Sequence, residues 1–190
     1  MLSNNDLNII VMGCINRDRI SQKDFYKNFY GYAAAICNRY VANNDELLEV
    51  VNDGFLKIYK EIDKFDTSVA HLESRLMSWI RAIMVHTSVD YYRKKMRDKI
   101  SLGYSDENIE HIEYDEETPV DKLSYHEIVA LTNQLSPMYK LVFNMNIIDG
   151  LSHDEISKKL NISTGTSKSN LFKARQIIIK LIEKKYKQIV

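Results

Sequence analysis

Residues 152–175, SHDEISKKLNISTGTSKSNLFKAR, concentrate polar and basic side chains on one predicted helix. Lysine contacts phosphates or guanine acceptors, asparagine suits adenine, and phenylalanine can meet the methyl group of thymine. Two short helices joined by a tight turn are typical of a helix-turn-helix that enters the major groove of DNA. A purely structural helical hairpin has similar spacing and stays an alternative. The residues predicted to face outward from the second helix are Thr166, Lys168, Ser169, Asn170, Phe172 and Lys173.

The other residues that could do chemistry form no catalytic or metal-binding pattern. Four histidines do not stand at metal-ligand spacing from cysteines or paired carboxylates. They are His71, His111, His126 and His153. The sequence has no glycine-rich phosphate loop, nucleophile elbow or carboxylate pair. Cys14 and Cys37 are far apart and outside any CxxC motif, which indicates reduced thiols in a cytoplasmic protein. We therefore predict no enzyme activity, no metal and no cofactor.

The charge of the chain is balanced overall but sorted into blocks. Lys and Arg number 26, as do Asp and Glu, so the formal net charge is zero. A basic block over residues 93–99 precedes an acidic one over 106–121, which contains no Lys or Arg. The last predicted helix is basic again. Charge sorted in this way indicates separate functional surfaces, although each block alone fits a solvated face.

Apolar residues recur at helical spacing over residues 25–40, 47–62 and 72–91. These three helices can bury one core, which predicts a first domain over residues 21–99 behind an N-terminal extension, 1–20. No run of 18 apolar residues occurs, so no membrane span is predicted. The N-terminus is also a poor signal peptide, since no basic residue precedes its short apolar run.

The second half of the chain is predicted to be an acidic linker followed by another helical domain. Residues 100–120 have no usable periodicity and are strongly acidic, which favours a flexible linker. In residues 121–190, Ser136-Pro137 predicts a helix start, and Gly150 predicts a helix end. Ser152 with Glu155 predicts a capping box, and Ser163 predicts the cap of the last helix. The expected fold is all-α, with two small helical domains.

Both predicted domains resemble one family. ELLEVVNDGFLKIYKEIDKFD and RLMSWIRAIMVHTSVDYYRKKMR resemble the second region of extracytoplasmic-function (ECF) sigma factors of bacterial RNA polymerase, within the sigma-70 family. LTNQLSPMYKLVFNMNIIDGLSHDEISKKLNISTGTSKSNLFKAR resembles their fourth region. DYYRKK and GTSKS look most like sigma factors of the Bacteroidetes type. The resemblance implies promoter-directed transcription initiation, with core RNA polymerase, promoter DNA and an anti-sigma factor as partners.

The resemblance also implies roles for particular residues. The surface that docks on the coiled coil of the largest polymerase subunit corresponds to Glu49, Asn52, Asp53, Leu56 and Lys57. The family usually has Gln and Glu where this chain has Asn52 and Asp53. Gly54 is unfavourable inside a helix by about 1 kcal/mol relative to Ala, which a closely packed neighbouring helix would explain.

The reader of the −10 element corresponds to Trp79, Arg81, His86, Tyr91, Arg93 and Lys94. Aromatic rings there can stack on unpaired bases while basic groups hold phosphates. Trp79 fits a core position equally well, and His86 stands where the family often has Asn. The six outward residues of the last helix correspond to the reader of the −35 element.

Two other classes of function remain open at this point. A transcription regulator could bind duplex DNA through the helix-turn-helix without polymerase, using its first domain as a sensor. A helical interaction module would bind no nucleic acid. A sigma factor needs no strongly basic chain, because core polymerase supplies most of the non-specific DNA affinity.

Overall fold

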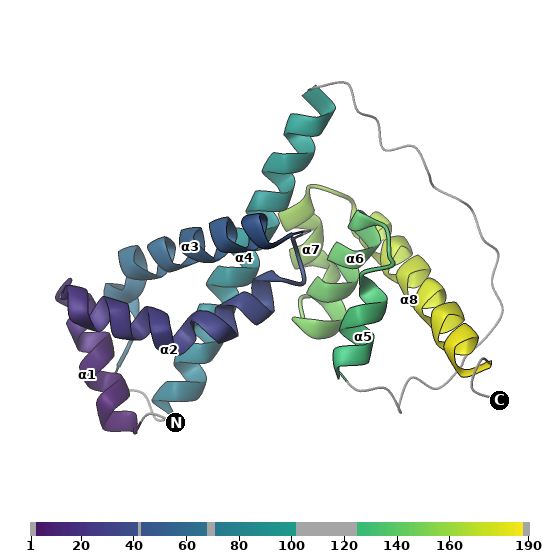
Figure 1. Cartoon of the computed structure of the whole chain (residues 1–190). Coiled ribbons are helices and arrows are strands. Elements are labelled where there is room, and N and C mark those ends of the chain that lie inside the picture. The colour runs from purple at the N-terminus through teal and green to yellow at the C-terminus, as the bar shows by residue number, and fades with distance from the viewer. Residues whose placement is uncertain (1–2, 42, 68–70, 102–124, 188–190) are drawn as a thin grey trace. The chain divides into compact units, whose positions relative to one another are not determined.

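In a computed structural model of the chain, the structure describes residues 3–41, 43–67, 71–101 and 125–187. Every regular element in these ranges is a helix, which confirms the predicted all-α class. The chain divides into two compact units, Met1–Lys95 and Met96–Val190. Figure 1 shows their helices in chain order. Residues 102–120, most of the predicted linker, lie outside the described ranges.

The first helix, α1 (Asn4–Ile15), is part of the core of the first unit and not a detached extension. Ser3 and Asp6 form a capping box at its start. Leu7, Val11 and Cys14 follow at intervals of four and three residues, so they share one helix face. All three are at most 2% exposed. The N-terminal segment therefore packs against the predicted domain, on α2 and η1 (Ile62–Lys64).

Two long helices, α2 (Arg19–Cys37) and α3 (Asn44–Glu61), pack side by side and build an aromatic core (Figure 1). The ring of Phe25 lies 4.7 Å from that of Phe29 and 6.3 Å from that of Phe55, measured between centroids. Both Phe25 and Phe55 are almost completely buried. Burying a phenylalanine side chain contributes roughly 1.5–3 kcal/mol, so these contacts account for the close approach of the two helices.

The fourth helix, α4 (Leu72–Ser101), packs against α2 and α3 through buried residues that include Met84. Met84 lies directly over Gly54, where a Cβ atom would collide with the Met84 sulfur. The Cys37 Sγ lies 3.8 Å from the same sulfur. This close approach is the reason for a glycine inside α3, as the sequence predicted. The helix continues two residues beyond the expected end of the domain at residue 99.

The second unit contains α5 (Tyr125–Thr132), α6 (Pro137–Phe143), α7 (His153–Leu160) and α8 (Thr164–Lys187). Pro137 opens α6 as predicted, but Ser136 makes no side-chain cap hydrogen bond. The chain then forms one π-helical turn, η2 (Asn144–Ile148), before Gly150 with φ of +74°. Gly150 therefore supplies the left-handed residue that ends this helical segment.

Among the described residues, no helix is both long enough and apolar enough to cross a membrane.

Candidate nucleic-acid and protein interfaces

Hydrogen bonds at the helix ends fix the turn between α7 and α8. Ser152 and Glu155 form the predicted capping box at the start of α7, and their hydrogen bonds hold the pKa of Glu155 below its ordinary value. Asn161 ends α7 in the left-handed conformation, with φ of 54°. Ser163 then caps α8, because its Oγ accepts a hydrogen bond of 2.9 Å from the Thr166 amide. The predicted helix-turn-helix is therefore present, with both caps as expected.

The buried stripe of α8 leaves the opposite side of the helix open. Leu171, Ala174 and Ile178 are at most 5% exposed and face the unit's interior. Of the six residues predicted to face outward, four are exposed and two are half-buried. The exposed ones are Thr166, Lys168, Ser169 and Phe172, and the half-buried ones are Asn170 and Lys173.

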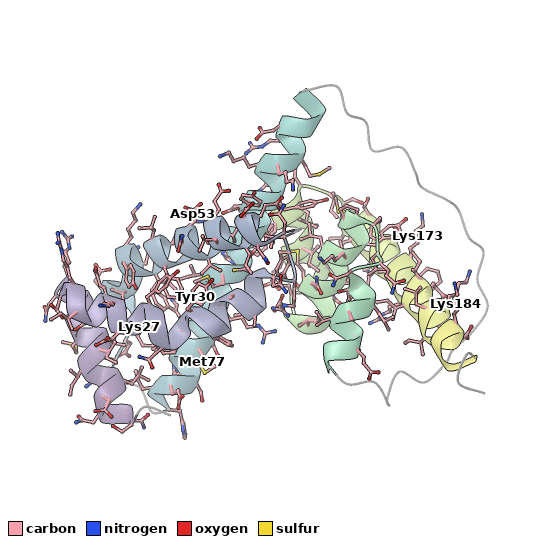
Figure 2. The ribbon with its side chains drawn as sticks, in the orientation of Figure 1. Lys27, Tyr30, Asp53, Met77, Lys173 and Lys184 are labelled. Carbon is pink, nitrogen blue, oxygen red and sulfur yellow. The ribbon has the colours of Figure 1, made fainter. Side chains whose placement is uncertain are left out.

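Two stripes of polar, basic and aromatic side chains run along this open side of α8. Lys168, Phe172 and Arg175 are spaced by four and three residues, which places them on one stripe. Ser169 and Lys173 belong to a neighbouring stripe that continues to Lys184. Figure 2 shows Lys173 and Lys184 on the same side of the helix. Arg175 is exposed and was not among the predicted site residues, although its spacing from Lys168 and Phe172 is visible in the sequence.

A contact that the sequence did not reveal joins the start of α7 to the second turn of α8. The Nδ1 atom of His153 lies 2.9 Å from the Oγ atom of Ser167. Ser167 is fully buried, while His153 is half-buried. The pair is 14 residues apart, so only the folded arrangement of α7 on α8 brings it together. This contact helps to fix the angle between α7 and α8.

Four of the five predicted docking residues form one exposed face on α3. Glu49, Asn52, Asp53 and Leu56 follow the spacing of one helix stripe, and all four are exposed. Asp53 lies on the outer side of α3 (Figure 2). The Oδ1 atom of Asn52 accepts a hydrogen bond of 3.0 Å from the Tyr26 hydroxyl, which holds the amide against α2.

Two leucines on this face are about half exposed to solvent. Leu56 is 56% exposed, and Leu48, which the sequence analysis did not select, is 50% exposed. The two leucines are eight residues apart, with Asn52 midway between them, so they line up along the helix. Apolar side chains flanked by carboxylates are suited to a partner surface that carries both apolar and basic groups.

The remaining predicted docking residue, Lys57, is engaged within the unit. Its Nζ atom lies 3.3 Å from the Asp90 carboxylate of α4. Glu46 of α3 pairs in the same way with Lys95 of α4. A partly exposed ion pair contributes about 0–1 kcal/mol to stability. Lys57 therefore links α3 to α4 and is not presented to a partner in the way that Asp53 is.

Only part of the predicted −10 set shares one face of α4. Trp79, His86 and Arg93 follow at intervals of seven residues and are nearly in line, with Lys94 beside them. His86, Arg93 and Lys94 are exposed, while Trp79 is half-buried. Its ring packs on that of Phe65 with 5.3 Å between centroids. Trp79 therefore has a packing contact and is also partly open to solvent.

Two other predicted −10 residues point elsewhere. Arg81 is two positions from Trp79, which turns it about 200° around the helix. Tyr91 is turned toward α3. Burial raises the pKa of Tyr91 above its ordinary value, and so do the Glu46 and Glu49 charges and a hydrogen bond to Glu49. The structure thus connects Tyr91 to α3, a contact that sequence spacing does not contain.

The two thiols are not poised for chemistry. Burial raises the pKa of Cys14 to about 12 and that of Cys37 to about 11, so both are protonated at neutral pH. Within the described part of the chain, no three His, Cys, Asp or Glu side chains come together in a group that could hold a metal ion.

Two family models match the chain, one in each compact unit. "Sigma-70 region 2" matches residues 25–98, and "Sigma-70, region 4" matches residues 125–178. The first match covers α3 and most of α4, which ends at Ser101. The second covers the helix-turn-helix and the exposed side of α8 as far as Ile178. Between them they account for well over half of the sequence.

Characterised relatives align over most of their length. The ECF RNA polymerase sigma-E factor of Haemophilus influenzae is 24% identical over 85% of this chain and 90% of its own. RNA polymerase sigma factor SigV of Bacillus subtilis is 25% identical over 83% of both chains. The sigma-E factor of Escherichia coli is 26% identical over 76% of this chain and 78% of its own.

Two solved structures are also similar. One is CnrH in complex with the cytosolic domain of CnrY, at 15% identity and a TM-score of 0.47, covering 93% of this chain and 96% of that chain. The other is the sigma factor RpoE in complex with the anti-sigma factor NepR from Bartonella quintana, at 17% identity and a TM-score of 0.48, covering 85% and 98%.

Region 2 and region 4 therefore occur on this one chain in that order, each on its own compact unit. The chain belongs to the sigma-70 family of RNA polymerase sigma factors, within its extracytoplasmic-function group.

Proposed function

We propose that this protein binds core RNA polymerase through its first unit and directs the enzyme to promoters whose −10 and −35 elements it reads. The single observation that carries this function is the pair of family matches, region 2 on one compact unit and region 4 on the other. The proposed functional regions are residues 21–99, on which α1 packs, and residues 121–190, and residues 100–120 join them. The protein would work in the cytoplasm and would have no catalytic activity of its own.

The exposed face of α3 is the proposed polymerase-docking surface, and Leu48 and Leu56 are its apolar contacts. Half of each leucine is open to solvent. A partner that covers them would gain about 25 cal/mol of binding free energy for each Å² of apolar surface removed from water. Glu49 and Asp53 would meet basic groups of the partner and set the register. An anti-sigma factor, which the sequence resemblance implied as a partner, would have to cover the same leucines to compete.

The face of α4 that carries Trp79, His86 and Arg93 is the proposed −10 surface. The solvent-exposed part of the Trp79 ring can stack on a base that has left the duplex, a contact worth roughly 1–3 kcal/mol per base. Arg93 and Lys94, further along the same face, can hold the phosphates of that strand. His86 lies between them and is the residue placed to affect base preference. Arg81 and Tyr91 would act indirectly, since they do not share this face.

The open side of α8 is the proposed −35 surface. Lys168 and Phe172 lie toward the N-terminal half of the helix, the part that enters the major groove in a helix-turn-helix. Arg175 extends their stripe and is added to the set. Lys173 belongs to the neighbouring stripe with Lys184, where phosphate contacts are expected.

Transcription in vitro with core polymerase tests the proposal. Core enzyme plus this protein should give transcripts from specific promoters in a genomic library, and core enzyme alone should not. Tight operator binding without polymerase, together with no promoter-specific transcript in its presence, would instead favour a polymerase-independent regulator.

A further inference from the structure

We infer that a basic hollow where the α1–α2 turn meets the C-terminal end of α3 receives an acidic side chain of core RNA polymerase. The hollow would extend the docking surface beyond the region 2 match. The inference rests on the proposed docking function and adds to it a second contact of opposite charge.

The hollow has a mixed lining that suits a carboxylate-bearing side chain of a protein. It encloses about 520 Å³, and Ile15, Leu56, Tyr59 and Ile62 provide its apolar and aromatic part. Three cations, Arg17, Arg19 and Lys60, also line it, against one carboxylate, Asp63. The lining therefore carries an excess of positive charge over an apolar floor.

The cations are available for a partner. Arg17, Arg19 and Lys60 are all exposed, and none of them forms an ion pair with another residue that the structure describes. A carboxylate that approached the hollow would meet unneutralised positive charge at its rim.

The turn that presents two of these cations is held in one conformation. Arg17 has φ of 59°, in the left-handed region, and its amide donates to the Cys14 carbonyl at 3.0 Å. The Asp18 amide donates to the Gly13 carbonyl at 2.9 Å, and the Asp18 carboxylate caps α2. Gly13 packs so closely on Ser21 that a Cβ atom would collide with it. The hollow is therefore preformed, which lowers the entropy lost on binding.

Continuity with the docking face identifies the occupant as polymerase. Leu56 belongs both to the exposed stripe of α3 and to the lining of the hollow. Along that stripe the charge changes from acidic at Glu49 and Asp53 to basic at Lys60. Such a surface is complementary to a partner that carries basic groups at one end and acidic groups at the other. Because the reversed orientation would bring like charges together, this pattern fixes the direction of docking.

The family match begins at residue 25, so the α1–α2 turn lies outside it. Arg17 and Arg19 would therefore add specificity for the cognate polymerase to a shared mode of docking.

Association of the full-length protein with its cognate core polymerase tests the inference, measured by stopped-flow fluorescence at low and high salt. Arg19→Glu and Lys60→Glu should each slow association by about three- to tenfold at low salt, with little change in dissociation. The difference should shrink at high salt because the charges are screened. Asp63→Asn removes the carboxylate that lines the hollow and should speed association, an effect that misfolding cannot imitate.

Lys27→Glu is the matched control, since Lys27 is an exposed lysine of α2 outside the hollow (Figure 2). It should change the association rate less than twofold. Equal slowing by Lys27→Glu would overturn the inference in favour of an effect of net charge.

Unchanged rates for the Arg19, Lys60 and Asp63 variants, with Asp53→Lys still weakening core binding, would overturn the inference and leave the proposed function standing. Unchanged core association with weaker holoenzyme binding to promoter DNA would overturn it in favour of a nucleic-acid contact. If the wild-type chain does not bind core polymerase, the proposed function fails as well.

Discussion

The Lys57 ammonium group lies 3.3 Å from the Asp90 carboxylate, which joins the helix proposed to dock on polymerase to the helix proposed to read the −10 element. The side chains are 42% and 64% exposed, so solvent screens the pair. Lys57→Ala should therefore lower the free energy of unfolding by less than about 1 kcal/mol. Asp53→Lys should weaken core binding by a few kcal/mol where the contact is desolvated, with little change in stability. Urea unfolding and a core-binding titration separate the two effects. A larger binding loss for Lys57→Ala than for Asp53→Lys would contradict this division of roles.

The contact between Gly54 and Met84 predicts opposite results for two glycine-to-alanine substitutions. Gly54→Ala gains helix propensity of about 1 kcal/mol but forces the buried Met84 side chain to move, which costs about 1–3 kcal/mol. A net destabilisation is expected. Gly31→Ala in α2 has no neighbouring atom within 4 Å and should stabilise the protein by up to about 1 kcal/mol. Urea unfolding of both variants provides the measurement. Met84→Ala should remove the penalty at Gly54, and stabilisation by Gly54→Ala in the wild-type background would contradict the packing.

The aligned face of α4 predicts which aromatic residue contacts the melted strand. Trp79→Ala should reduce −10 opening, measured by permanganate reactivity of promoter thymines in the holoenzyme, because a stacking surface is lost. His86→Asn should change the preference among −10 sequences more than it changes overall affinity. Tyr91→Phe removes only the hydroxyl near Glu49 and should leave −10 preference unaltered. A change in base preference with Tyr91→Phe, and none with His86→Asn, would contradict this arrangement.

The two stripes of α8 predict different losses for two lysines. Lys168→Ala should cost about 1–3 kcal/mol at one position of the −35 element, because a base contact is lost. Lys173→Ala should weaken all −35 sequences alike and lower the slope of log affinity against log salt by about 0.9. Holoenzyme affinity for single-base −35 variants at several salt concentrations distinguishes these outcomes. Equal and sequence-independent losses for both variants would refute base reading by Lys168.

The buried thiols predict a loss of stability in alkaline solution. Burial raises the pKa of Cys37 from an ordinary 9.0 to about 11 and that of Cys14 to about 12. The unfolded chain gives up these protons at lower pH than the folded chain does. The contribution of the protonated thiols to the free energy of unfolding is therefore complete below pH 9. It is lost as the pH rises through the pKa values of the folded state. Urea unfolding between pH 8 and 10.5 should show stability falling with pH, and less steeply for Cys37→Ala. An identical pH dependence for that variant would contradict the assignment to Cys37.

The sequence by itself determined the α-helices from α2 onward, the starts of α6, α7 and α8, and the two regions of the family. The Ser152 and Ser163 caps, the outward side of α8 and the need for a close neighbour at Gly54 follow from local chemistry and helix periodicity. Local rules suffice there because a cap or a stripe depends on residues three or four positions apart.

Only the tertiary structure decided which side chains meet across helices. It placed Leu7, Val11 and Cys14 of the presumed extension in the core, directed Lys57 to Asp90 and turned Tyr91 toward Glu49. It also brought His153 to Ser167, and the α1–α2 turn to the end of α3. These contacts join residues 14 to more than 40 positions apart, and their geometry depends on how whole helix faces pack. Periodicity in one helix specifies which face is buried, but it does not specify which neighbour covers that face.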